Sequence, residues 1–138
     1  MKHKPVFSGD VIVQWLTDGR TMELLEDFSF VDAKGISWRA PAGSIVNGAS
    51  IPRILWPVVG SPFAGRYRRA SVLHDVACQE RIRPWKKVHK MFYQAMRADN
   101  TPKSKAKQMY KAVRMFGPRW DEDGNLLEIR IDSDELYL

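Results

Sequence analysis

The segment from residue 45 to residue 75 restricts the fold most, because its backbone cannot be regular throughout. It reads IVNGASIPRILWPVVGSPFAGRYRRASVLHD and contains three glycines and three prolines. Asn47-Gly48 favours a sharp turn with positive φ, and Pro52 disfavours a helical conformation at Ile51. We therefore expect regular structure before Asn47 and after Gly65, with an irregular connection between them.

Before this segment, apolar and polar residues alternate, which predicts an antiparallel β-meander between about residues 5 and 46. Residues 17–19 (Thr-Asp-Gly) would form a hairpin turn, and residues 32–35 (Asp-Ala-Lys-Gly) a second turn. Ile51, Ile54, Leu55 and Trp56 are expected to fill the core beyond the Asn47-Gly48 turn.

After Gly65, apolar residues recur every three or four positions, which predicts three helices. The first covers about residues 66–80, and the second begins at Pro84 and ends at Asp99. The third begins with Thr101 as its N-cap and stops at Gly117-Pro118. Residues 126–131 alternate as a final strand. The prediction is an α+β fold in a single domain of residues 1–138.

Composition excludes several classes of protein. The single cysteine, Cys78, rules out an internal disulfide and suits a reducing compartment. No apolar run approaches the roughly 18 residues of a membrane span, so no membrane association is expected. The first ten residues contain lysines but no apolar region behind them, so we expect no signal peptide.

Basic residues are concentrated in the helical half. Residues 66–119 contain 15 Lys or Arg and three acidic residues, within a chain of net charge +6. The interpretation we favour is solvated helix faces balanced by acidic chain ends. The alternative is nucleic-acid binding, through Arg68, Arg69, Lys86, Lys87, Lys90, Lys103, Lys107 and Lys111.

Two histidines fall on the apolar faces of neighbouring helices. His74 lies four residues before Cys78, and His89 lies beside the apolar stripe of the second helix. If these helices pack antiparallel, the two rings meet. With Asp75 or Cys78 they could bind zinc or another divalent transition metal, which would activate water for hydrolysis.

A structural role is the alternative that we favour at this point. His74 would then be a core histidine hydrogen-bonded to backbone carbonyls of the Asn47–Pro52 turn, and Cys78 a small apolar residue. The sequence contains no HExxH or CxxC pair, which disfavours the metal site.

Two further sites centre on Ser50. A catalytic group of Ser50, His74 and Asp75 is disfavoured, because adjacent residues of a helix diverge and no G-x-S-x-G motif is present. Backbone N–H groups of Asn47, Gly48 and Ser50 could bind an anion. We favour a structural turn, with the side chain of Ser50 or Asn47 as its cap.

The chain resembles a phage and prophage family known as domain of unknown function 1353. The resemblance rests on residues 47–75, on MFYQAM at residues 91–96 and on MYKAVRMFG at residues 109–117. It implies a tailed-phage or prophage origin and an α+β fold, and it brings no established reaction. The family pattern usually has aspartate in place of Asn47 and an acidic residue in place of His89, so two potential carboxylate ligands are absent.

Three functions remain open. We favour a phage accessory or virion-associated protein that interacts with phage or host proteins, located in the host cytoplasm during infection or in the virion. The second is a metal-dependent hydrolase, and the third is a nucleic-acid-binding accessory protein.

Overall fold

The structure, a computed structural model, describes residues 4–48, 50–51 and 67–128. Six strands form two antiparallel sheets, in the orders β1-β4-β5 and β2-β3-β6. Their bounds are β1 Val6–Phe7, β2 Val13–Trp15, β3 Met22–Leu24, β4 Phe28–Val31, β5 Ser37–Ala40 and β6 Ile45–Val46. The three helices are α2 Arg68–Glu80, α3 Trp85–Ala98 and α4 Lys103–Phe116. The predicted α+β class is confirmed.

Consecutive strands pair in two hairpins, β2-β3 and β4-β5, but the six strands do not form one continuous meander. β2 and β3 form the predicted hairpin, and the carboxylate of Asp18 accepts the backbone N–H groups of Arg20 (2.9 Å) and Thr21 (2.8 Å) in its turn. β1 instead pairs with β4, and β6 pairs with β3. The short strands at both ends of this region therefore join partners that are distant in the sequence.

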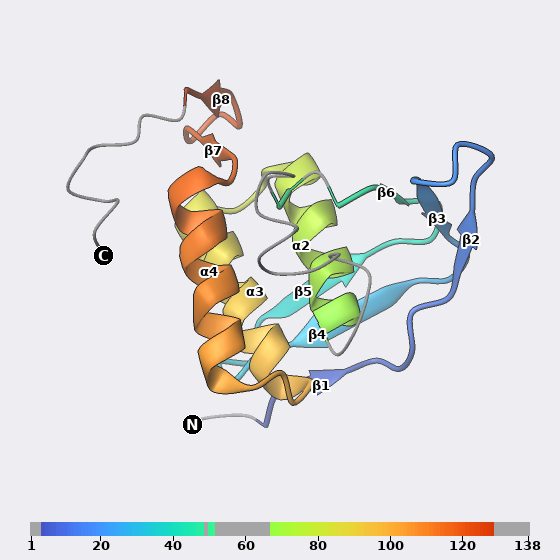
Figure 1. Cartoon of the computed structure of the whole chain (residues 1–138), viewed down its shortest axis with the longest axis horizontal. Coiled ribbons are helices and arrows are strands. Elements are labelled where there is room, and N and C mark those ends of the chain that lie inside the picture. The colour runs from blue at the N-terminus through green and yellow to red at the C-terminus, as the bar shows by residue number, and fades with distance from the viewer. Residues whose placement is uncertain (1–3, 49, 52–66, 129–138) are drawn as a thin grey trace.

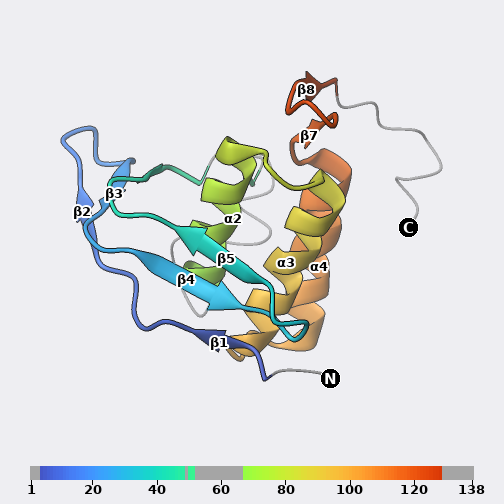
Figure 2. The same cartoon turned by 180° about the vertical axis from the view of Figure 1, so that it is seen from behind.

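The helices lie in layers on one side of the β1-β4-β5 sheet (Figures 1 and 2). α2 packs against β5, α3 packs against α2, and α4 packs against α3 on the side away from the sheet. Residues with no more than 2% exposure, including Phe28, Phe30, Val72, Phe92 and Met96, fill the space between these layers. α2 is thus enclosed between the sheet and α3, and all of its residues from Ala70 to Val76, including His74, are buried.

The helix bounds agree with the predicted ranges to within about two residues, except for the cap of α4. Pro102, and not Thr101, occupies the N-cap position of α4. The backbone N–H of Thr101 instead donates to the carbonyl of Met96 at 2.9 Å, at the end of α3. Thr101 belongs to the α3–α4 turn because the two helices follow each other so closely, so the predicted N-cap is wrong.

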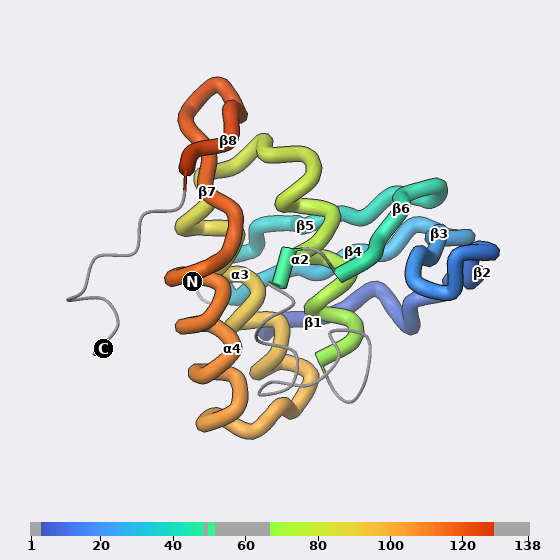
Figure 3. Tube along the Cα trace, turned by 45° about the horizontal axis from the view of Figure 1, so that its top comes forward, coloured from blue at the N-terminus to red at the C-terminus, as the bar shows by residue number. Residues whose placement is uncertain are grey.

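Beyond α4, strands β7 (Arg119–Trp120) and β8 (Leu126–Leu127) form a small hairpin. The hairpin lies past the end of α4, near the link between α2 and α3 (Figure 3). The indole N–H of Trp120 donates to the carbonyl of Arg83 in that link at 2.8 Å. The strand predicted from residue 126 is confirmed at its start, and residues 129–131 lie outside the described part of the chain.

The predicted turn after β6 is confirmed. Gly48 has φ +77°, and the N–H of Ile51 donates to the carbonyl of Gly48 at 3.0 Å. Ile51 is 2% exposed, as expected of a core residue. Pro52, Ile54, Leu55 and Trp56 lie outside the described residues. Within the described ranges, none of the helices has the length and apolar character needed to cross a membrane.

Phe92→Ala should lower the free energy of unfolding by about 3–5 kcal/mol, because the Phe92 side chain is fully buried on α3 and stacks on the His74 ring. Urea denaturation measures this loss. Lys90→Ala removes an exposed side chain from the same helix and should change stability by less than about 0.5 kcal/mol. Equal effects of the two substitutions would contradict this packing.

Candidate functional site

The two histidines meet inside the helical layer. Nε2 of His74 on α2 lies 2.8 Å from Nδ1 of His89 on α3, and both residues have no exposed surface. The short link of residues 81–84 brings the two helices together as an antiparallel pair. The predicted meeting of the two rings is confirmed.

Each ring is also held through its other nitrogen. Nδ1 of His74 lies 3.1 Å from Oγ of Ser50, in the turn after β6. Nε2 of His89 lies 2.9 Å from the carbonyl oxygen of Pro118, beyond α4. Since a carbonyl can only accept a hydrogen bond, Nε2 of His89 carries a proton and Nδ1 of neutral His89 carries a lone pair. This lone pair points at His74.

Aromatic side chains fix the planes of both rings. Phe92 stacks on His74 with ring centroids 4.5 Å apart. Trp85 and Trp120 lie beside His89, at centroid distances of 5.8 Å and 6.2 Å. The imidazoles are therefore oriented by packing as well as by hydrogen bonds, which limits reorganisation when a ligand binds.

Cys78 completes a group of three potential metal ligands. It lies one helical turn after His74 on α2, with its Sγ 3.6 Å from Nε2 of His74. Each of His74, Cys78 and His89 offers one donor atom, and the three atoms lie within 4.8 Å of one another. Two imidazole nitrogens and a thiol are ligands typical of zinc. The structure thus brings together three of the four predicted metal ligands.

Asp75, the fourth predicted ligand, faces the turn after β6 instead. Its carboxylate accepts the backbone N–H groups of Asn47 at 3.0 Å and Ser50 at 3.2 Å, and also that of Gly48. Gln79, one turn later on α2, donates its side-chain amide to Asp75 at 3.2 Å and to the carbonyl of Ile45 at 2.7 Å. The N–H groups that were predicted as an anion site therefore bind the protein's own carboxylate.

The predicted group of Ser50, His74 and Asp75 is assembled in a different order. Ser50 lies between the other two, in contact with Nδ1 of His74 and with the Asp75 carboxylate. Nε2 of His74 contacts His89, so neither ring nitrogen is left for Asp75 to orient. The backbone N–H groups nearest Ser50 are engaged by Asp75, so they cannot stabilise an oxyanion at the same time.

An open pocket of about 550 Å³ adjoins this site. Ser50, Asp75 and Cys78 line it, together with residues that flank the turn and the β7–β8 hairpin, namely Ile45, Asn47, Gln79, Arg81, Pro118 and Leu126. Cys78 is 9% exposed and lines the pocket, whereas the two histidines have no exposed surface and do not line it. A ligand in the pocket would therefore approach the three donor atoms from the side of the cysteine.

Burial controls the protonation of these groups. It lowers the pKa of His74 well below its usual range, and the positive charge on His89 would lower it further. Burial also lowers the pKa of His89 to about 4, with additional lowering by Arg119 and Arg114. Burial and the charge of Asp75 raise the pKa of the Cys78 thiol. At neutral pH both imidazoles are neutral, which is the form that binds a metal ion.

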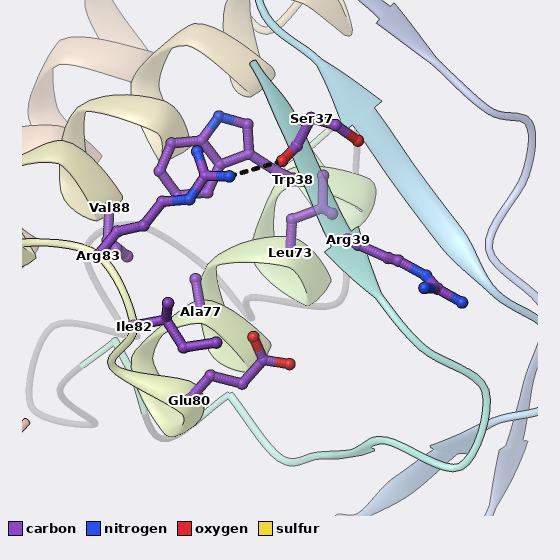
Figure 4. A pocket seen from close by; sticks show the side chains of 9 residues that line it. All are labelled: Ser37, Trp38, Arg39, Leu73, Ala77, Glu80, Ile82, Arg83 and Val88. Atoms are coloured by element: carbon purple, nitrogen blue, oxygen red, sulfur yellow. Dashed lines mark hydrogen bonds between the residues drawn. The ribbon is translucent and has the colours of Figure 1, made fainter.

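A second, smaller pocket lies on the other side of α2, against β5 (Figure 4). It has a volume of about 160 Å³ and contains Leu73, Ala77 and Val88 at its apolar wall. The guanidinium of Arg83 stacks over Trp38, with its carbon 4.2 Å from the ring centroid, and donates to the carbonyl of Ser37 at 2.9 Å. This pocket holds none of the three metal-ligand candidates.

The residues predicted to bind nucleic acid do not all line one groove. Arg69 is bound to the carboxylate of Asp99 and to the carbonyl of Gly9, so it has a structural role. Lys86, Lys107 and Lys111 line a groove between α3 and α4. The remaining predicted residues, Arg68, Lys87, Lys90 and Lys103, are exposed but do not line this groove.

Some residues of the site were not predicted. Gln79 was not among the predicted site residues, although it lies four residues after Asp75 and this helical spacing indicates their contact. The carbonyl of Pro118 had no such signal, because a backbone acceptor is present in every residue. Arg114 and Arg119 also line the α3–α4 groove, and Arg114 follows Lys107 and Lys111 at helical spacing.

Comparison with known proteins identifies relatives for most of the chain. It is 48% identical over 98 residues to the uncharacterized protein y4jT of Sinorhizobium fredii (strain NBRC 101917 / NGR234), covering 71% of this chain and 29% of that protein. It is 40% identical over 120 residues to the uncharacterized protein y4iH of the same strain, covering 86% of this chain and 50% of that protein. The chain thus spans half or less of these relatives. No solved structure matches it significantly.

A family model described as "Protein of unknown function (DUF1353)" matches residues 22–113. This range contains Ser50, His74, Asp75, Cys78 and His89, and it covers more than half of the chain. The resemblance indicated by residues 47–75 is confirmed. The chain therefore belongs to the DUF1353 family of proteins of unknown function.

Proposed function

We propose that this protein is a metal-dependent hydrolase whose ion is bound by His74, His89 and Cys78. The observation that carries the proposal is the convergence of Nε2 of His74, Nδ1 of His89 and Sγ of Cys78 within 4.8 Å. A small shift apart of the two nitrogens would let both reach one ion, since they now lie at hydrogen-bonding distance. The N₂S donor set favours zinc or a similar transition metal over magnesium or calcium, which prefer oxygen.

The surrounding hydrogen bonds support this assignment. A metal-bound histidine usually donates its other ring N–H to a carbonyl, a carboxylate or another acceptor. His89 has the carbonyl of Pro118 in this position, and His74 has the hydroxyl of Ser50. Ser50 in turn contacts the Asp75 carboxylate. A chain of Asp75, Ser50 and His74 would then orient the ligand nitrogen of His74 toward the ion.

Without an ion, a proton between Nε2 of His74 and Nδ1 of His89 is compatible with the same arrangement of the two rings. The N–H at Nε2 of His74 then donates to the lone pair at Nδ1 of His89, and Nδ1 of His74 accepts from the Ser50 hydroxyl. Metal binding would need the proton of neutral His74 on Nδ1 instead of Nε2, so that Nδ1 donates to Ser50 and the Ser50 hydroxyl donates to Asp75, and the thiol proton of Cys78 would be released to solvent. The buried histidine pair is therefore compatible with both states and needs no large movement of α2 or α3.

Hydrolysis is the chemistry that this arrangement supports best. Three protein ligands leave one tetrahedral position for water, and a zinc ion lowers the pKa of that water to near 7. The open pocket beside Cys78 provides space for a substrate. Asp75 is a positioning residue in this proposal, because its oxygens are engaged by the turn and by Gln79.

Several finer expectations stay predictions. These are the phage or prophage origin implied by the family resemblance, the location in host cytoplasm or virion, the interaction with phage or host proteins, and the organisation of residues 1–138 as one domain. The curated relatives are longer than this chain, so the proposal concerns the site within the shared segment.

The first prediction of the proposal is one zinc ion per chain. Protein purified without a histidine tag and dialysed against zinc should retain one equivalent, and zinc at a hundred times its Kd should stabilise the fold by about 2.7 kcal/mol. Cys78→Ser and His89→Gln should each reduce metal retention strongly. Elemental analysis and thermal denaturation measure both effects.

His3→Ala is the matched control, because it removes the remaining histidine of the chain while leaving the proposed ligands unchanged. It should retain one zinc ion. Zinc retention that is unaffected by both Cys78→Ser and His89→Gln, or no retention by the unaltered chain, would refute the site.

The second prediction separates metal-dependent hydrolysis from acyl transfer. The zinc-loaded chain should hydrolyse p-nitrophenyl acetate or bis(p-nitrophenyl) phosphate, and a chelator should abolish the activity. The absorbance of the released p-nitrophenolate measures the rate. Ser50→Ala should retain measurable activity, whereas Cys78→Ser should lose it. The reverse order would indicate a serine nucleophile, and zinc binding without any hydrolysis would leave a structural metal site and disprove the hydrolase.

A further inference from the structure

A basic groove between α3 and α4 lies apart from the three metal-ligand candidates. It has a volume of about 620 Å³. Five basic side chains line it, namely Lys86, Lys107, Lys111, Arg114 and Arg119, and no acidic residue among those that the structure describes does so. Groups of like charge repel each other, so this arrangement favours an anionic ligand.

Charge within the described part of the chain does not neutralise the groove. Lys86, Lys107, Lys111 and Arg114 form no ion pair with any described residue. By contrast, Arg69, in the first turn of α2, forms an ion pair with Asp99. These four cations are therefore not held in an ion pair with a described residue, as Arg69 is.

Two contacts hold part of this charge in place. The guanidinium carbon of Arg119 lies 4.7 Å from the ring centroid of Trp85, and Arg119 donates to the carbonyl of Arg114 at 2.8 Å. Nζ of Lys86 lies 5.5 Å from the same indole ring. Cation–π contact with Trp85 thus orients two cations before any ligand binds, which lowers the entropic cost of binding.

The remaining cations form a row along α4. Lys107, Lys111 and Arg114 lie at positions i, i+4 and i+7, so they share one face, and the Cβ atoms of neighbours in this row are about 5–6 Å apart. Steps of this size are comparable to those between successive phosphates of an extended single strand. Tyr110, on the same face, lines the groove and receives a hydrogen bond from Arg114 at 3.3 Å.

We propose that the α3–α4 groove binds single-stranded nucleic acid, with the row on α4 contacting phosphates and Tyr110 stacking on a base. Basic grooves that contain aromatic side chains are typical of proteins that bind single strands without sequence preference. A concave groove also favours a flexible strand over a duplex. Because no metal-ligand candidate lines it, the proposal can fail or hold independently of the hydrolase.

Fluorescence anisotropy of a labelled oligothymidylate tests this binding. With four or five phosphate contacts, the affinity of the full chain should fall roughly 50- to 100-fold between about 50 and 200 mM NaCl. The triple variant Lys107→Gln/Lys111→Gln/Arg114→Gln should bind at least tenfold more weakly at low salt. Its slope of log K against log salt should be smaller by about 2.

The matched control removes the same charge elsewhere. Lys4→Gln/Arg20→Gln/Lys34→Gln changes three exposed residues of the β region and should alter the affinity less than twofold. Tyr110→Leu keeps every charge, and should weaken binding about fivefold or more with an unchanged salt slope.

Four results would overturn the proposal: no binding at low salt, equal losses in the two triple variants, tighter binding of a duplex of the same length, or competition by polyglutamate as effective as by unlabelled oligothymidylate. The last two would assign the groove to duplex DNA or to an acidic protein.

Discussion

The contact between the imidazoles of His74 and His89 is the interaction on which the helical half of the protein depends. It joins α2 to α3 through two fully buried polar rings, and a buried polar group without a partner costs about 1–3 kcal/mol. Ser50 and the carbonyl of Pro118 satisfy the outer nitrogens. The turn after β6, two helices and the chain beyond α4 therefore meet at one polar chain inside an apolar layer.

Asp75 plays the complementary part by fixing the turn that presents Ser50. Its carboxylate replaces an external anion at the backbone N–H groups of Asn47 and Ser50, and burial raises its pKa despite these hydrogen bonds. The adjacent residues His74 and Asp75 thus diverge on α2, one toward α3 and the other toward the turn. Because the two side chains diverge, they do not act as a catalytic pair. His74 is the proposed metal ligand, and Asp75 holds Ser50, which orients His74.

Sequence pattern predicted the features that depend on side-chain spacing. The three helices follow from apolar periodicity, and the meeting of His74 and His89 follows from the short link between α2 and α3. The division of strands between two sheets could not be predicted, because β1 and β6 pair with distant partners. The backbone partners of Asp75 and His89 were also hidden, since backbone N–H and C=O groups carry no sequence signature.

X-ray absorption at the zinc edge tests the central claim most directly, because it measures the atoms bound to the ion. The account predicts one sulfur ligand at about 2.3 Å and two imidazole nitrogens at about 2.0–2.1 Å, with a light atom in the fourth position. A ligand shell of oxygen and nitrogen without sulfur, or a sulfur ligand that is still detected in Cys78→Ser, would contradict binding by His74, His89 and Cys78.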